Sequence, residues 1–143
     1  MNFLHPHLDL LLRAAALAQF AVAVLNLWLI RIMNWKNDLD RMPLLVREVF
    51  KIHVFFISIT LSIFAALTWR FANEISTATS PLAVWLGTGI GLFWLTRSLI
   101  QWSHYSASHW RGNTIRTLIH WLLFLGYAGL AGVYLSAGLW GNK

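Results

Sequence analysis

Two histidines and two arginines stand inside long apolar stretches of the sequence or at their ends. They are His53, His120, Arg97 and Arg116. Ionisable groups are costly in such surroundings and therefore indicate a functional site. An imidazole can coordinate a metal or hydrogen-bond a ligand, and a guanidinium group pairs with anionic oxygens. These residue types together predict a site for a ligand or a cofactor.

Helical spacing adds polar residues to these four. At 100° per residue, Arg97, Gln101 and His104 fall within an arc of about 60°. Glu48 lies about 140° from His53 on the same helix, so both cannot point at one centre. Alternatively, Glu48 forms only a local ion pair with Lys51, three residues further along the same helix. The candidate site comprises Glu48, His53, Arg97, Gln101, His104, Arg116 and His120.

The two imidazoles fit haem b in particular. Such a haem needs two neutral histidines on facing helices at matched depth, and His53 and His120 would be its axial ligands. Arg97 or Arg116 would then pair with the propionates. A quinone head group would use the same polar end of the helices. The metal role of the two histidines depends on a haem being present, and snorkelling to the interface is the alternative for both arginines.

Other chemistries are disfavoured by the composition. The chain has no Cys, which excludes disulfides, iron–sulfur clusters, thiolate zinc sites and covalent c-type haem. No acid is placed to orient a buried histidine as in a Ser-His-Asp hydrolase. The Glu-x-x-His motifs of a di-iron carboxylate site are also missing. Catalysis is therefore not assigned to any residue.

The elements that must position these residues are membrane-spanning helices. Of the 143 residues, 58% are hydrophobic and only 11% are charged, unlike a soluble enzyme. Four segments have the roughly 20 apolar residues that a span requires. We expect helices at about 8–33, 43–71, 81–104 and 115–140, with a short turn over 72–80 before Pro81. The sequence predicts one all-α domain over 1–143, a polytopic four-helix membrane bundle.

The basic residues predict an orientation for this bundle. Most of them lie in the connection between the first and second spans or in that between the third and fourth, counted with the helix turns that adjoin each connection. Positive loops face the cytoplasm, so we expect both termini on the non-cytoplasmic side of an inner or plasma membrane. His53, Arg97 and His120 would then share the cytoplasmic end of the bundle.

The expected partners are lipid and other membrane helices. Gly87 and Gly91 have the GxxxG spacing that lets helix backbones approach, as small residues do along the fourth span. We therefore expect a homo-oligomer or a larger membrane complex. The net charge of +6 is explained by basic loops beside anionic lipid, so no nucleic-acid partner is expected.

In outline the chain resembles the MAPEG membrane proteins, which include glutathione transferases. The resembling residues are Arg47, Glu48, Lys51 and His53 in the second span, Arg97 and Tyr105 in the third, and Arg116 in the fourth. The resemblance implies a trimer that binds glutathione through arginines at the cytoplasmic side. The sequence departs from the family in the order of Arg47 and Glu48, and in lacking an Asn and a Glu after His53.

The sequence thus leaves three functions open. The favoured one is an accessory subunit, or a ligand- or cofactor-binding subunit, of a larger membrane assembly, because the chain is small and has no soluble domain. The second is electron transfer with haem b or a quinone. The third is a MAPEG-like, glutathione-dependent membrane enzyme.

Overall fold

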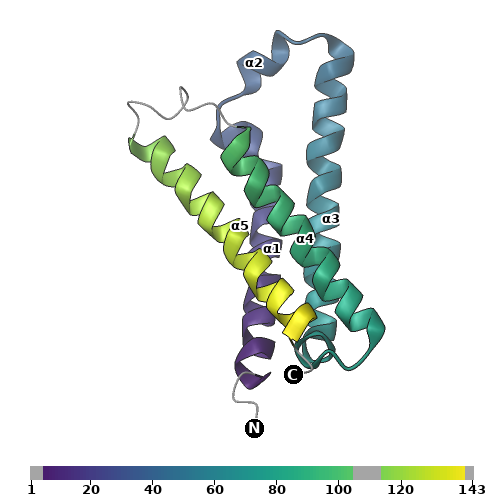
Figure 1. Ribbon diagram of the computed structural model, residues 1–143. Coiled ribbons are helices and arrows are strands. Elements are labelled where there is room, and N and C mark those ends of the chain that lie inside the picture. The colour runs from purple at the N-terminus through teal and green to yellow at the C-terminus, as the bar shows by residue number, and fades with distance from the viewer. Residues whose placement is uncertain (1–4, 105–113, 141–143) are drawn as a thin grey trace. The chain divides into compact units, whose positions relative to one another are not determined.

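The computed structural model describes residues 5–104 and 114–140, and these residues are almost entirely helical (Figure 1). The helices are α1 (His5–Ile32), α2 (Lys36–Asp40), α3 (Leu44–Thr77), α4 (Pro81–Ser103) and α5 (Thr114–Trp140). The described ranges contain no strand. The expected all-α fold with four long helices is confirmed, and the short α2 was not expected.

The four long helices have the length and the composition of membrane spans. Their apolar stretches have mean hydropathies of 1.8, 2.0, 1.3 and 1.7 in chain order. Large apolar side chains are exposed on all of them, including Leu17, Phe56, Leu82 and Leu122. Exposing so much contiguous apolar surface to water is energetically unfavourable, whereas the acyl chains of a bilayer solvate it. The chain is therefore a multi-pass integral membrane protein, and its orientation stays a prediction.

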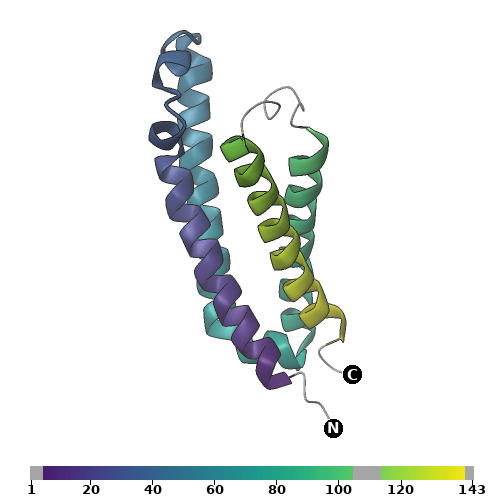
Figure 2. The same cartoon turned by 90° about the vertical axis from the view of Figure 1, so that its left-hand side faces the viewer.

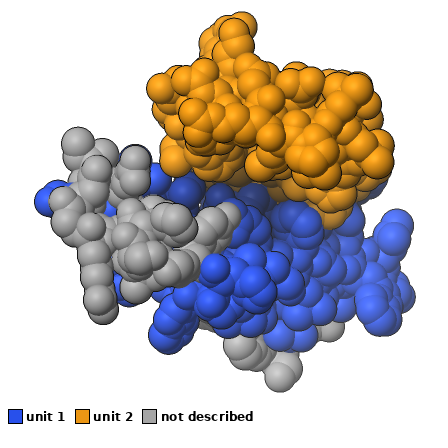
Figure 3. All heavy atoms as spheres, turned by 90° about the horizontal axis from the view of Figure 1, so that it is seen from above, with its two compact units in different colours: residues 1–12, 71–143 blue, residues 13–70 orange. Residues whose placement is uncertain are grey.

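The described chain forms two compact units, which Figure 3 shows in different colours. Unit 1 comprises residues 1–12 and 71–143, and unit 2 comprises residues 13–70. In unit 2, the Nδ2 atom of Asn26 on α1 donates to the Val54 carbonyl at 2.9 Å and to Ser58 Oγ at 3.0 Å on α3. This interhelical bond satisfies a polar side chain within the span and fixes α1 against α3.

In unit 1, α4 and α5 lie side by side and antiparallel (Figure 2). Glycines permit the close approach at one end of this pair. A Cβ added to Gly138 would lie 2.5 Å from Thr88 Oγ1, and one added to Gly91 would lie 2.8 Å from the Leu135 side chain. A Cβ added to Gly87 would lie 3.5 Å from the Gly138 Cα atom. The GxxxG pair of α4 therefore contacts α5 within its own unit.

Local signals explain where the helices begin and end. Ser80 caps α4 by accepting the Ala83 N–H at 3.2 Å, and Pro81 follows it as the first helical residue, as expected. Residues in the left-handed region end α1 and α3, namely Asn34 (φ 55°) and Ala78 (φ 47°). In both cases the next N–H bonds a carbonyl five residues back, as in a Schellman motif.

The second long helix extends further than the sequence indicated. The expected turn over 72–80 is wrong for residues 72–77, because α3 continues to Thr77. Its polar side chains bond within the helix, since Ser76 and Thr77 both donate to the Asn73 carbonyl. Phe71 interrupts the helical dihedral angles (φ −111°, ψ 19°), so α3 is kinked there.

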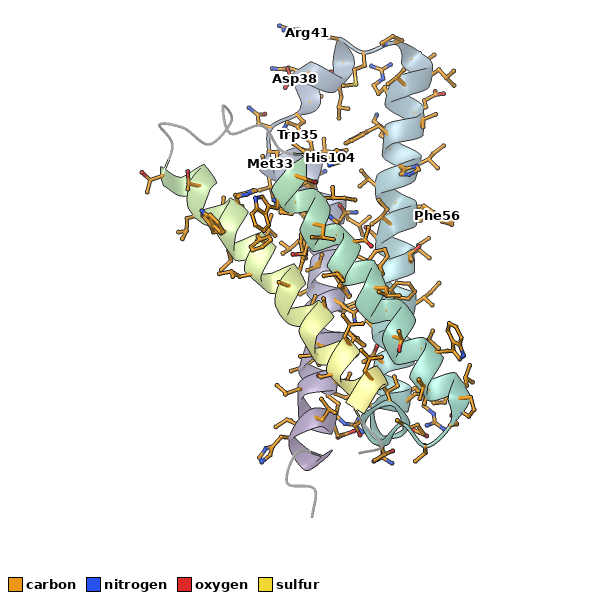
Figure 4. All side chains as sticks on the ribbon, viewed as in Figure 1. Met33, Trp35, Asp38, Arg41, Phe56 and His104 are labelled. Carbon is orange, nitrogen blue, oxygen red and sulfur yellow. The ribbon has the colours of Figure 1, made fainter. Side chains whose placement is uncertain are left out.

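Figure 4 shows charged side chains on and just after α2 and a large apolar side chain on α3. Asp38 and Arg41 lie on and just after α2, whereas Phe56 extends outward from α3 with 66% of its surface exposed. Arg47 pairs with Asp40 across the turn, with 3.2 Å between Nη1 and Oδ1. Both partners are partly solvated, so this pair contributes little stability.

Candidate functional site

A row of three polar side chains joins α4 to α5. Arg97 donates from Nη1 to Gln101 Oε1 at 3.1 Å, one helical turn along α4. The Gln101 amide nitrogen then lies 3.0 Å from His120 Nδ1 on α5. Because the Gln101 oxygen already accepts from Arg97, its NH₂ group is the donor and the imidazole nitrogen accepts. Three of the residues singled out in the sequence thus form one hydrogen-bonded row.

The members of this row differ in burial. Gln101 is only 2% exposed, whereas Arg97 and His120 are half-buried. A buried amide with both of its ends bonded holds its two neighbours in fixed positions. The row therefore presents a guanidinium and an imidazole at the edge of the helix pair, with an ordered amide between them.

Aromatic rings support the arginine from α5. The Arg97 guanidinium carbon lies 4.8 Å from the centroid of the Tyr127 ring, within the range of a cation–π contact. Tyr127 in turn stacks on Trp94, with ring centroids 5.3 Å apart and planes 24° apart. Trp94 is 1% exposed. This fixed aromatic pair limits the positions open to the guanidinium group.

The charge of Arg97 is not balanced within its helix pair. The last acidic residue of the chain is Glu74, and the 69 residues after it include four basic residues and no Asp or Glu. Glu74 lies near the end of α3, just before α4 begins at Pro81. Arg97 is about 24 Å further along α4 from Pro81. Among the described residues of unit 1, no carboxylate lies within ion-pair distance of Arg97.

A shallow groove on α4 leads to Arg97. Its volume is about 370 Å³, and it is open to the surroundings. It is lined by Gly89, Leu92, Phe93, Thr96, Arg97 and Ile100. A Cβ added to Gly89 would meet nothing within 4 Å, so this glycine widens the groove. The groove is therefore a mostly apolar surface with one cation, Arg97, near one end.

The other expected site residues lie in unit 2, at the end of α4 or in the first turn of α5. Glu48 and His53 belong to unit 2, where both are exposed on α3. The expected pairing of Glu48 with Lys51 is absent from the described residues, and Arg47 pairs with Asp40 instead. His104 ends α4 and is exposed, with its Nδ1 atom 3.0 Å from Ser103 Oγ.

Arg116 lies in the first turn of α5, and its side chain is outside the described residues, as is all of Tyr105. Within the described ranges, no group of three or more His, Asp or Glu side chains gathers in a way that would hold a metal ion. The use of His53 and His120 as haem ligands stays a prediction.

Sequence reasoning missed two contributors to this site. Trp94 is the largest buried side chain of α4, but a tryptophan in an apolar span gives no signal of its own. Ser98 is 3% exposed and donates to the Phe124 carbonyl on α5 at 3.4 Å. The sequence did contain a signal for Ser98. It precedes Gln101 by three residues, and residues at this spacing lie on the same face of a helix.

Comparison with protein-family models, curated proteins and solved structures finds no match to this chain. The resemblance to the MAPEG proteins therefore rests on the residues quoted above. Of these, Arg97 lies in the row described here, and Arg47, Glu48, Lys51 and His53 lie in the other unit.

Proposed function

We propose that the protein is a ligand-binding accessory subunit of a larger membrane assembly, with its site at Arg97, Gln101 and His120. The observation that carries this proposal is the arginine held at the edge of a membrane-spanning helix pair that contains no acid. Such a charge is costly unless something outside the pair balances it. A ligand with an anionic or electron-rich head would do so, at the end of the bundle that we expect to be cytoplasmic.

The row has the hydrogen-bonding properties that such a ligand needs. A guanidinium group has five N–H donors, and among the described residues one of them has an acceptor, Gln101. Tyr127 and Gln101 hold the group in place, so a ligand would not have to order a flexible side chain. Binding, rather than catalysis, is the function that these contacts support.

An open glycine face on α5 supports the accessory role. Gly126, Gly129 and Gly132 are exposed, and a Cβ added to any of them would meet nothing within 4 Å. Small residues on a membrane helix allow another helix to pack closely. This face is therefore suited to a helix of a partner subunit or of a second copy of the chain.

The ligand proposal can be tested on protein purified gently from its native membrane. The intact protein is weighed by native mass spectrometry, and bound molecules are then extracted with solvent and identified. We expect one bound molecule per chain in the wild type and none in Arg97→Gln. Arg31→Gln is the matched control, because Arg31 also lies over an aromatic ring, Trp28, near a helix end. Bare wild-type protein would contradict the proposal.

The same extraction decides between the open functions. A quinone or a haem lost in Arg97→Gln would place the protein in electron transfer. Glutathione would favour the MAPEG-like alternative. Co-purification of a larger membrane protein, lost when Gly129 is changed to Leu, would support the accessory role.

A further inference from the structure

We infer that Arg97 binds the phosphate of an anionic phospholipid whose acyl chain lies along the α4 groove. This inference rests on the proposed function, because it names the ligand class of the same site. It joins two observations, namely that no acid within the helix pair balances the charge of Arg97, and that the apolar groove on α4 includes this residue.

The positive charge of the site favours a ligand with an anionic headgroup. Residues 75–143 carry basic side chains and no acidic ones, so the helix pair has a positive charge that needs an anion. Guanidinium groups bind phosphate oxygens through two parallel hydrogen bonds. A phospholipid with a net negative charge supplies that anion, whereas the ammonium group of a zwitterionic lipid competes with Arg97 for its own phosphate.

The apolar lining of the groove favours a ligand with an acyl chain. Leu92 and Phe93 give it apolar walls between Arg97 and Gly89, and Gly89 leaves open space at the end away from Arg97. From Arg97 back to Gly89 the helix rises by about 12 Å, enough to seat a substantial part of one acyl chain. A free phosphate or a water-soluble phosphate ester would leave this surface unused.

The depth of Arg97 matches the position of a lipid phosphate. Arg97 precedes the last residue of α4, Ser103, by six residues, which is about 9 Å along the helix. A long arginine side chain reaches from such a depth to the headgroup level. The direction from Arg97 to Gly89 then points toward the middle of the bilayer, where acyl chains lie.

The test uses the full chain, stripped of lipid in detergent and titrated with phosphatidylglycerol or with phosphatidylcholine of the same acyl chains. Bound lipid is counted by native mass spectrometry. We expect phosphatidylglycerol to bind at least tenfold more tightly, and inorganic phosphate not to displace it. Arg97→Gln should abolish the preference and Arg97→Lys should keep part of it. Arg31→Gln should leave the preference unchanged.

A second variant tests the groove without touching the charge. Gly89→Leu fills open space, so the protein should fold normally while its affinity for phosphatidylglycerol falls. Equal binding of the two lipids would overturn the inference, as would equal losses in Arg97→Gln and Arg31→Gln, or displacement by inorganic phosphate. If a different molecule binds at Arg97, this inference fails and the proposed function stands. If nothing binds there, both fail.

Discussion

The amide nitrogen of Gln101 lies 3.0 Å from Nδ1 of His120, which joins α4 to α5 within the membrane-spanning region. Arg97 bonds the other end of the same amide at 3.1 Å, so the orientation of Gln101 is fixed from both sides. The imidazole must then carry its proton on Nε2 in order to accept at Nδ1. The proposals made above depend on this row.

Replacing Gln101 with Leu should destabilise the helix pair. Interhelical hydrogen bonds in membranes contribute roughly 0.6–1.7 kcal/mol each, and both Arg97 and His120 would lose a partner. We expect the free energy of unfolding to fall by about 1–2 kcal/mol. A detergent-unfolding titration followed by circular dichroism measures this change. His104→Ala is the control, because that side chain is exposed at the end of α4 and should leave stability unaltered.

The glycines of α5 should differ in their tolerance of a methyl group. In Gly138→Ala the new Cβ would stand 2.5 Å from Thr88 Oγ1 and 2.9 Å from the Thr88 backbone nitrogen, so the helices must separate. We expect a loss of about 1–3 kcal/mol in the free energy of unfolding. In Gly132→Ala the new Cβ meets nothing within 4 Å, so the higher helix propensity of alanine should raise the free energy of unfolding by up to about 1 kcal/mol. Equal effects of the two changes would show that α4 and α5 do not cross at Gly138.

The end of α3 offers a stabilising substitution. Ala78 has a φ of 47°, a conformation that costs L-residues about 1–2 kcal/mol and costs glycine little. Ala78→Gly should therefore raise the free energy of unfolding by about 1 kcal/mol. Ala18→Gly, in the middle of α1, should lower it by about 1 kcal/mol. Thermal unfolding in detergent measures both, and a loss in Ala78→Gly would argue against this helix end.

The absence of cysteine makes the topology directly testable. Lys36→Cys, on α2, and Thr79→Cys, in the turn before α4, place single exposed thiols at opposite ends of α3. A membrane-impermeant maleimide added to intact cells should label Thr79→Cys, and Lys36→Cys should react only after lysis. Labelling of both residues from outside would contradict a span between them. The reverse pattern would overturn only the expected orientation.

The sequence predicted the long helices well, because each has an apolar stretch long enough to cross a bilayer. It missed the last six residues of α3, where Asn73 and Glu74 read as a loop although the side chains of Ser76 and Thr77 bond back within the helix. It also missed α2, which is five residues long and too short for a periodic pattern.

The candidate site was predictable in part. Arg97 and Gln101 are four residues apart on one helix, so their contact follows from helical geometry. The pairing of Gln101 with His120 could not be derived, because it depends on how α5 packs beside α4. Glu48 and His53 lie in unit 2, and their grouping with the row stays a prediction, because depth and residue type do not determine which face of a helix meets a neighbour.

The most direct test of the central row is the ¹⁵N NMR spectrum of histidine-labelled protein in lipid nanodiscs. We predict that Nδ1 of His120 lacks a proton and that its resonance shifts in Gln101→Leu. The signals of His53, which is exposed in the other unit, should not move. A His120 ring with both nitrogens protonated, or one whose resonances are the same in Gln101→Leu, would contradict the row and the ligand site built on it.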